Sequence, residues 1–141
     1  MIAERFDRWA LLVTVAASEV DADAARRNAL RAALRSWRFA VDASTVDLPA
    51  RRRRRMGLTR EDVAELAGLS ICWYTLFESG STKHRCSPRA VDRVADALGL
   101  GKEDRAILQI LASPEAFQSV RVILEPWILG EAVDAVGIVR T

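Results

Sequence analysis

Apolar residues recur every three or four positions along almost the whole chain, which is the spacing of amphipathic helices. One such stripe runs through residues 5–20 and a second through residues 21–41. Residues 42–55 include Pro49 and are predicted to connect the second helix to the next one. Further helices are predicted at about 60–67, 70–78, 87–98, 103–111 and 113–124. The pattern therefore predicts an all-α protein built as a helical bundle.

Two short predicted helices between residues 59 and 80 are joined by a tight turn. Thr59 is placed to cap the first helix, and Asp62 completes a Thr-x-x-Asp capping box. Gly68 suits the left-handed conformation that ends a helix, and Ser70 can cap the second helix. The residues expected to face inward are Val63, Ala64, Leu66, Ala67, Leu69, Tyr74, Phe77 and part of Trp73. This arrangement predicts a helix-turn-helix, whose second helix enters the major groove of DNA.

The charge of the chain is concentrated on the same region. The 141 residues carry a net charge of only +2, but residues 51–89 contain nine Lys or Arg against four acids. Residues 1–50 sum to zero and residues 90–141 to −3. Binding to the phosphate backbone requires such a positive block. It begins with an unbroken basic run of Arg51, Arg52, Arg53, Arg54 and Arg55, which can also be read as a solvated segment without a partner.

The same segment resembles the lambda-repressor-like, Xre-type helix-turn-helix family of bacterial and phage regulators. The small residue in the family's first helix matches Ala64, its turn glycine matches Gly68, and its apolar turn residue matches Leu69. The buried positions of the family's recognition helix match Tyr74 and Phe77. The resemblance covers roughly residues 30–112 and implies sequence-specific DNA binding and transcriptional control by a homodimer.

One subgroup is more similar still. The run from residue 58 to 68, followed by Trp73-Tyr74, Glu78-Ser-Gly80 and Ser87-Pro88, resembles bacterial regulators whose helix-turn-helix precedes a PAS-like (MmyB-like) or GAF sensory domain. The resemblance implies that five side chains of the second helix face the bases: Ile71, Cys72, Thr75, Leu76 and Ser79. None of these is Arg, Asn or Gln, the residues that make bidentate contacts with guanine or adenine.

Phosphate contacts are better supplied than base contacts. Besides the arginine run, they are predicted for Arg60, Ser70, Lys83, His84, Arg85 and Arg89. The apolar face of the second helix leaves another interpretation open. In this alternative, the fold is a protein-interaction module that docks a sigma factor or another regulator through Ile71, Cys72, Trp73 and Leu76.

We expect three parts along the chain. Residues 1–23 form an N-terminal amphipathic helix, which either joins two copies in a dimer or covers the core of the monomer. Residues 24–112 form the helix-turn-helix domain. Residues 113–141 form a C-terminal helix and a tail, which is either helical or the start of a truncated sensory domain that opens with a strand at about residues 135–141.

Catalytic and metal-binding signatures are lacking in the sequence. There is a single histidine, His84, and no Gly-rich phosphate loop or nucleophile motif, so we expect no enzyme, no cofactor and no metal. Cys72 and Cys86 are expected to be reduced thiols, with a redox switch at Cys72 as the less favoured alternative. No apolar run approaches the roughly 18 residues of a membrane span, and no signal peptide is recognisable. We therefore expect a cytoplasmic protein whose partner is double-stranded DNA and not a membrane.

Overall fold

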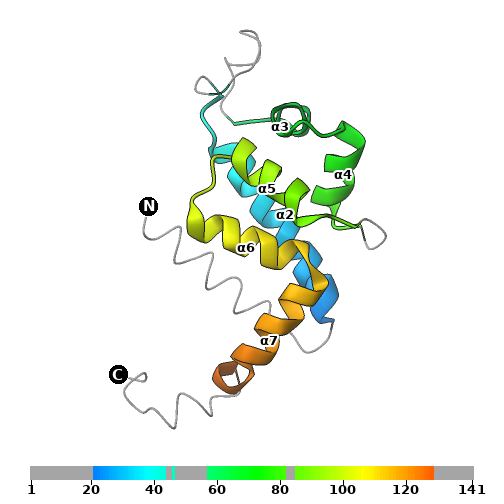
Figure 1. Cartoon of the computed structure of the whole chain (residues 1–141), viewed down its shortest axis with the longest axis vertical. Helices are drawn as coiled ribbons and strands as arrows, with labels where there is room; N and C mark the ends of the chain where they lie inside the picture. The colour runs from blue at the N-terminus through cyan, green and yellow to red at the C-terminus, as the bar shows by residue number, and fades with distance from the viewer. Residues whose placement is uncertain (1–20, 44–45, 47–56, 82–84, 129–141) are drawn as a thin grey trace.

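The structure is a computed structural model that describes residues 21–43, 46, 57–81 and 85–128, the last five of them by backbone alone. In this part of the chain the elements are all helices, which confirms the predicted all-α class (Figure 1). Their bounds are α2 Ala22–Ala40, α3 Arg60–Ala67, α4 Ile71–Ser79, α5 Pro88–Ala97, α6 Lys102–Ala112 and α7 Pro114–Ile128.

Capping residues mark the starts of α2 and α5. Asp21 accepts a hydrogen bond from the backbone N–H of Ala24 at 3.0 Å and so starts α2. The hydroxyl of Ser87 accepts one from Ala90 at 3.1 Å, and Pro88 occupies the first position of α5. Both caps involve only residues within three positions of each other in the sequence.

The last helix is longer than the sequence predicted. The sequence predicts an end near residue 124, two residues before Pro126, and proline disfavours a helical conformation in the residue before it. Instead α7 continues through Pro126 to Ile128. The preference imposed by proline is a tendency, and here the backbone remains helical through it.

The core is organised around α2. This helix packs against α4, α6 and α7, while α5 packs against α3 and α6. Figure 1 shows α3 and α4 at one end of the bundle and α7 at the other. The core side chains that are at most 3% exposed include Leu30, Leu34, Trp37, Val63, Tyr74, Phe77, Val91, Val94, Leu108, Leu111 and Phe117. Burial of each large apolar side chain stabilises the fold by about 1.5–3 kcal/mol before entropy is counted.

The corner between α6 and α7 is fixed to α2 by a buried arginine. Arg26 donates from Nη1 to the carbonyl oxygen of Leu111 at 2.8 Å, and from Nη2 to Asp23 at 3.0 Å. Phe117 of α7 is buried in the same core. The first half of α7 therefore packs against the bundle.

Some predictions lie outside the described residues. These are the helix at residues 5–20, with the interface or core role expected of it, and the tail at 129–141. Among the described residues, no helix is long and apolar enough to cross a membrane.

Candidate nucleic-acid interface

The turn between α3 and α4 has the local structure that its residues predict. Thr59 and Asp62 form both bonds of the capping box, at 3.1 Å to the N–H of Asp62 and 2.9 Å to the N–H of Thr59. Gly68 ends α3 in the left-handed conformation, with φ of +69°. Ser70 then starts α4 by accepting a hydrogen bond from Trp73 N–H at 3.0 Å.

The two faces of α4 differ sharply in exposure. Tyr74 and Phe77 are buried, and the ring of Trp73 packs beside Phe77 with centroids 5.0 Å apart. On the outer side, Ile71 and Leu76 are each 44% exposed. All five predicted base-reading side chains are exposed or half-exposed: Ile71, Cys72, Thr75, Leu76 and Ser79. The face that was expected to meet the bases is therefore open to solvent.

The buried face of α4 also carries a charged residue, Glu78, which is fully buried. Its carboxylate accepts two hydrogen bonds from Arg38 of α2, from Nε at 2.8 Å and from Nη2 at 2.9 Å. The Tyr74 hydroxyl donates to it at 2.9 Å, and Arg60 Nε donates at 2.7 Å. Arg38 also reaches the carbonyl oxygen of Leu58 at 3.0 Å. One carboxylate thus connects α2, α3 and α4.

The electrostatics of this cluster keep Glu78 ionised. Burial raises the pKa of Glu78, but its hydrogen bonds from Arg38, Arg60 and Tyr74 outweigh burial and lower the pKa below its usual value. Burial, followed by the charge of Glu78, raises the pKa of Tyr74 above its usual value, so the phenol stays protonated as a donor. A buried charge is tolerated here because every oxygen of the carboxylate has a hydrogen-bond donor.

The sequence analysis missed this cluster, because Glu78 was used only as part of the Glu78-Ser-Gly80 run that resembles the subgroup. A signal was present: Glu78 follows Tyr74 by four residues and Phe77 by one, so helical periodicity places it on the buried face. A buried carboxylate requires a cationic partner. The sequence could not show that this partner is Arg38, which lies 40 residues earlier.

Arg60, which was predicted to bind phosphate, lies at the start of α3. Its Nε is bound to Glu78, while its side chain remains 47% exposed. The ion pair therefore fixes one edge of the guanidinium and leaves the group at the surface. The first N–H groups of α3 and its dipole add a preference for anions at this place.

The remaining predicted phosphate contacts are only partly described. Ser70 is exposed, with its hydroxyl oxygen used as the cap of α4. Arg85 and Arg89 are exposed and lie just before α5 and in its first turn. Lys83, His84 and the run from Arg51 to Arg55 lie outside the described residues. The structure thus places Arg60 at the start of α3 and Ser70 at the start of α4, and Arg60 lines one hollow with Ile71 and Thr75 of α4.

The geometry of α3, the turn and α4 is matched by a comparison with known families. A family model described as a helix-turn-helix domain matches residues 29–108, which is more than half of the chain. The chain belongs to this helix-turn-helix family. In the same set of comparisons, no curated protein and no solved structure matched. Membership of the helix-turn-helix family suggests a DNA-binding regulator in general terms and confirms the predicted motif.

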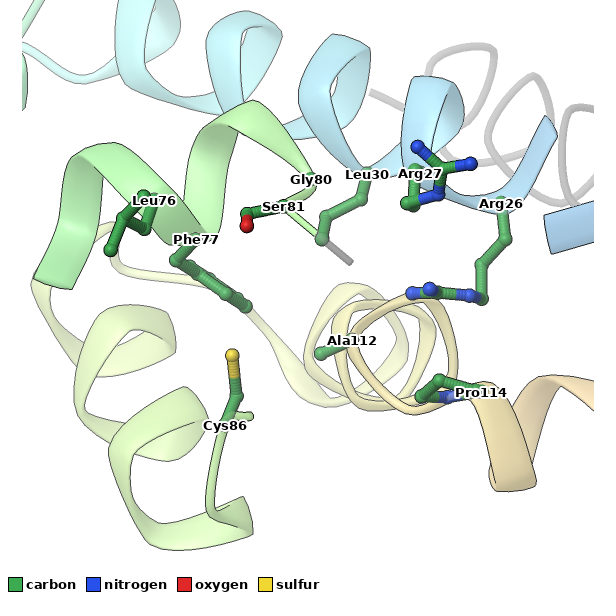
Figure 2. Close-up of a pocket in the computed structure, with 10 residues that line it drawn as sticks. All are labelled: Arg26, Arg27, Leu30, Leu76, Phe77, Gly80, Ser81, Cys86, Ala112 and Pro114. Carbon is green, nitrogen blue, oxygen red and sulfur yellow. The ribbon is translucent and has the colours of Figure 1, made fainter. Parts of the chain in front are cut away.

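The two cysteines of the helix-turn-helix domain are both free, and they differ in environment. Cys72 is exposed on α4. Figure 2 shows the sulfur of Cys86 pointing toward the ring of Phe77, into a hollow of about 50 Å³ that Leu30 and Ala112 also line. Burial raises the pKa of Cys86 to about 11, so this thiol is poorly reactive.

No group of metal-binding side chains occurs among the residues for which the structure gives positions.

Arg35 and Phe39 lie near the end of α2 and were not among the predicted site residues. They line an open hollow together with Arg60 and with Ile71 of α4. The sequence analysis missed them because it summed charge over residues 1–50, where acids elsewhere in the segment hide a local excess of arginine.

Proposed function

We propose that this chain is an Xre-type, sequence-specific transcriptional regulator that places α4 in the major groove of DNA. The observation that supports this most is the contrast between the two faces of α4. Its inner face is held to α2 and α3 through Glu78, and its outer face presents Ile71, Thr75 and Leu76 to solvent. Helix-turn-helix proteins read bases with such an outward face.

Direct readout of bases is expected to be modest. The exposed Ile71 and Leu76 suit contact with thymine methyl groups. Thr75 and Ser79 offer single hydrogen bonds, and the Ser79 hydroxyl already donates to the carbonyl of Leu76 at 2.8 Å. Since no bidentate side chain is present on this face, sequence-dependent DNA shape and backbone contacts supply a larger share of specificity.

Affinity is expected to come mainly from the phosphate backbone. Arg60, Arg85 and Arg89 are exposed near the ends of α3 and α5, and Ser70 lies at the start of α4. The sequence adds Lys83, His84 and the run from Arg51 to Arg55. If about 5–6 phosphates are neutralised, log affinity falls with log salt concentration at a slope near −5.

Selection from a random-sequence duplex library with the full chain tests the proposal. Selected duplexes should share a motif, and their affinity should show the predicted salt slope in fluorescence anisotropy.

Ile71→Ala should relax the base preference at one position of the motif. Arg60→Gln should weaken binding to all sequences and reduce the salt slope by about 1. Lys102→Gln is the charge-matched control, because α6 begins on the side of the molecule away from α4 (Figure 1). A library without enrichment, or affinity without salt dependence, contradicts the proposal.

The apolar character of the α4 outer face favours one alternative. Exposed Ile71 and Leu76, with Cys72 and the half-buried Trp73, would suit a protein-interaction module that docks a sigma factor or another regulator. Such a module would enrich no DNA motif. It would bind its protein partner with an affinity that Ile71→Ala lowers and that salt changes little.

We further infer a cytoplasmic bacterial homodimer of the subgroup with a PAS-like or GAF sensory domain. A single helix-turn-helix module buries little DNA surface, and twofold operators favour dimers. Residues 1–20 are the proposed dimer interface, because their sequence carries an apolar stripe at helical spacing that a second copy can cover. Sedimentation of a chain that lacks residues 1–20 but keeps the Asp21 cap of α2 tests this. If the truncated chain still forms dimers, residues 1–20 are not the dimer interface.

A further inference from the structure

An open hollow of about 660 Å³ lies beside the N-terminal half of α4. Arg35 and Phe39 of α2 form one wall, Arg60 marks the start of α3, and Ile71 and Thr75 of α4 form the opposite wall. The hollow is therefore shared by three helices, and two of its residues belong to the face of α4 that we propose reads bases.

The walls combine exposed apolar surface with positive charge. Phe39 is 57% exposed and Ile71 is 44% exposed. The guanidinium of Arg35 lies over the ring of Phe39, 5.8 Å from its centre, and that of Arg38 lies 5.1 Å from it. Arg38 is committed to Glu78, whereas Arg35 forms no ion pair with any residue that the structure describes. An exposed aromatic ring beside an exposed arginine offers a ligand both apolar surface and a positive charge.

Backbone hydrogen bonds hold the start of α3 against the end of α2, so the walls of the hollow keep their relative positions. The N–H of Gly57 donates to the carbonyl of Val41 at 2.9 Å, and that of Leu58 donates to Arg38 at 2.9 Å. A Cβ at Gly57 would approach Phe39 Cα to 3.0 Å, so the chain entering α3 lies directly against the end of α2. Phe39 and Arg60 are therefore held at a constant separation, as a binding site requires.

We propose that this hollow holds one deoxyribose-phosphate unit of the DNA backbone next to the major groove. Arg35 and Arg60 hold the phosphate, and Phe39 and Ile71 contact the carbon face of the sugar. The inference rests on the proposed DNA-binding function and adds α2 to the interface. The start of α3 favours an anion at the same place, while the exposed Glu61 on the rim restricts the phosphate to the arginine side.

An open hollow suits this ligand better than a free small molecule. Small-molecule sites enclose most of their ligand, whereas a DNA backbone passes along the surface and needs only one side covered. Since α4 would occupy the adjacent groove, the strand that borders this groove is the nearest polymer of sugars and phosphates.

The test uses the full chain and a duplex selected from the random library. Arg35→Gln should weaken binding roughly two- to fivefold and reduce the salt slope by about 1, as expected for one exposed charge contact. Phe39→Ala should weaken binding without changing the salt slope, and Phe39→Leu should restore most of the affinity. Both side chains are exposed, so the melting temperatures of the variants should stay near that of the wild type.

A series of duplexes, each with one neutral methylphosphonate linkage, locates the contact. One linkage beside the selected motif should weaken wild-type binding and have a smaller effect on Arg35→Gln, in which only Arg60 still holds that phosphate, whereas Lys102→Gln should respond like the wild type. If both α2 variants bind like the wild type and show the same interference pattern, the backbone site is wrong while the regulator proposal stands. If the wild type selects no duplex, both proposals fail.

Discussion

Arg38 and Glu78 lie 40 residues apart and form a buried bidentate ion pair, with N–O distances of 2.8 and 2.9 Å. The pair joins α2 to α4, and Arg60 and Tyr74 bind the same carboxylate from α3 and α4. A recognition helix can present a constant set of side chains only if its rotation about its own axis is fixed. Glu78 supplies that constraint from the side of α4 opposite the proposed DNA contacts.

Removal of this carboxylate should strongly destabilise the protein. Glu78→Gln leaves Arg38 buried without a counter-charge, and loss of one partner of a buried ion pair costs about 3–5 kcal/mol. Urea denaturation followed by circular dichroism measures the loss. Glu61→Gln removes an exposed acid from the first turn of α3 and should cost at most about 1 kcal/mol. If Glu78→Gln and Glu61→Gln lower the free energy of unfolding equally, the buried ion pair is not the main constraint on α4.

The same carboxylate should make the fold sensitive to acid. The folded pKa of Glu78 is depressed, so its contribution to stability is complete above the unfolded value of about 4.3 and is lost as pH falls below it. Asp23 acts in the same direction. Burial raises the pKa of Asp23, but Arg26 and Arg27 lower it by more, so the net shift is downward. Chemical denaturation at several pH values should show stability declining below about pH 4.3. In Glu78→Gln the decline should be much shallower, and an unchanged decline would contradict this assignment.

Tyr74 offers a direct optical report on the buried cluster, because it is the only tyrosine in the chain. Burial and the Glu78 carboxylate raise its pKa, so the folded protein should show no phenolate absorbance at pH values where a free tyrosine, with a pKa of about 10, ionises. Since the folded pKa is raised, its stabilisation is complete below that pH and is lost as pH rises. Phenolate absorbance should therefore appear together with loss of helical circular dichroism. If phenolate absorbance appears at a lower pH than the loss of helical circular dichroism, the Tyr74 phenol is accessible to water in the folded protein.

The sequence predicted the features of the fold that depend on neighbouring residues. The Thr59 capping box, the turn at Gly68 and the Ser70 cap each involve residues within four positions, and helical periodicity placed Tyr74 and Phe77 inside. The pairing of Arg38 with Glu78 could not be predicted in this way, because periodicity shows that a residue is buried and not what lies opposite it. The hollow beside α4 was missed for the same reason, since Arg35 and Ile71 come to line the same hollow only in the folded chain.

Two glycines with the same backbone conformation should tolerate substitution differently. Gly68 and Gly80 end α3 and α4 with φ of +69° and +72°. Alanine at either position is strained by roughly 1–2 kcal/mol from the backbone alone. A Cβ at Gly68 would meet no atom within 4 Å, whereas at Gly80 it would lie 2.9 Å from Arg27 Cβ and 3.2 Å from the Arg27 carbonyl oxygen.

Gly80→Ala should therefore destabilise the protein more than Gly68→Ala, because α4 must also move away from α2. Thermal melts of the two variants measure the difference directly. DNA affinity should fall further for Gly80→Ala at a temperature where both variants are folded, since the clash displaces the end of α4. Equal melting temperatures would mean that the contact between α4 and Arg27 relaxes without cost.

The two thiols should react at very different rates. Cys72 is exposed on the outer face of α4, whereas burial raises the pKa of Cys86 to about 11 and leaves about 0.1% thiolate at pH 8. An aromatic disulfide reagent should consume one thiol rapidly and the second slowly, and Cys72→Ser should remove the rapid phase alone. If α4 enters the major groove, DNA affinity should fall in step with the rapid phase, because the bulky adduct occupies the groove. If Cys72 is modified rapidly and DNA affinity does not fall, another surface of the protein reads the bases.

If both thiols react equally rapidly, the hollow around Cys86 opens easily, in conflict with the packing of Cys86 against Phe77.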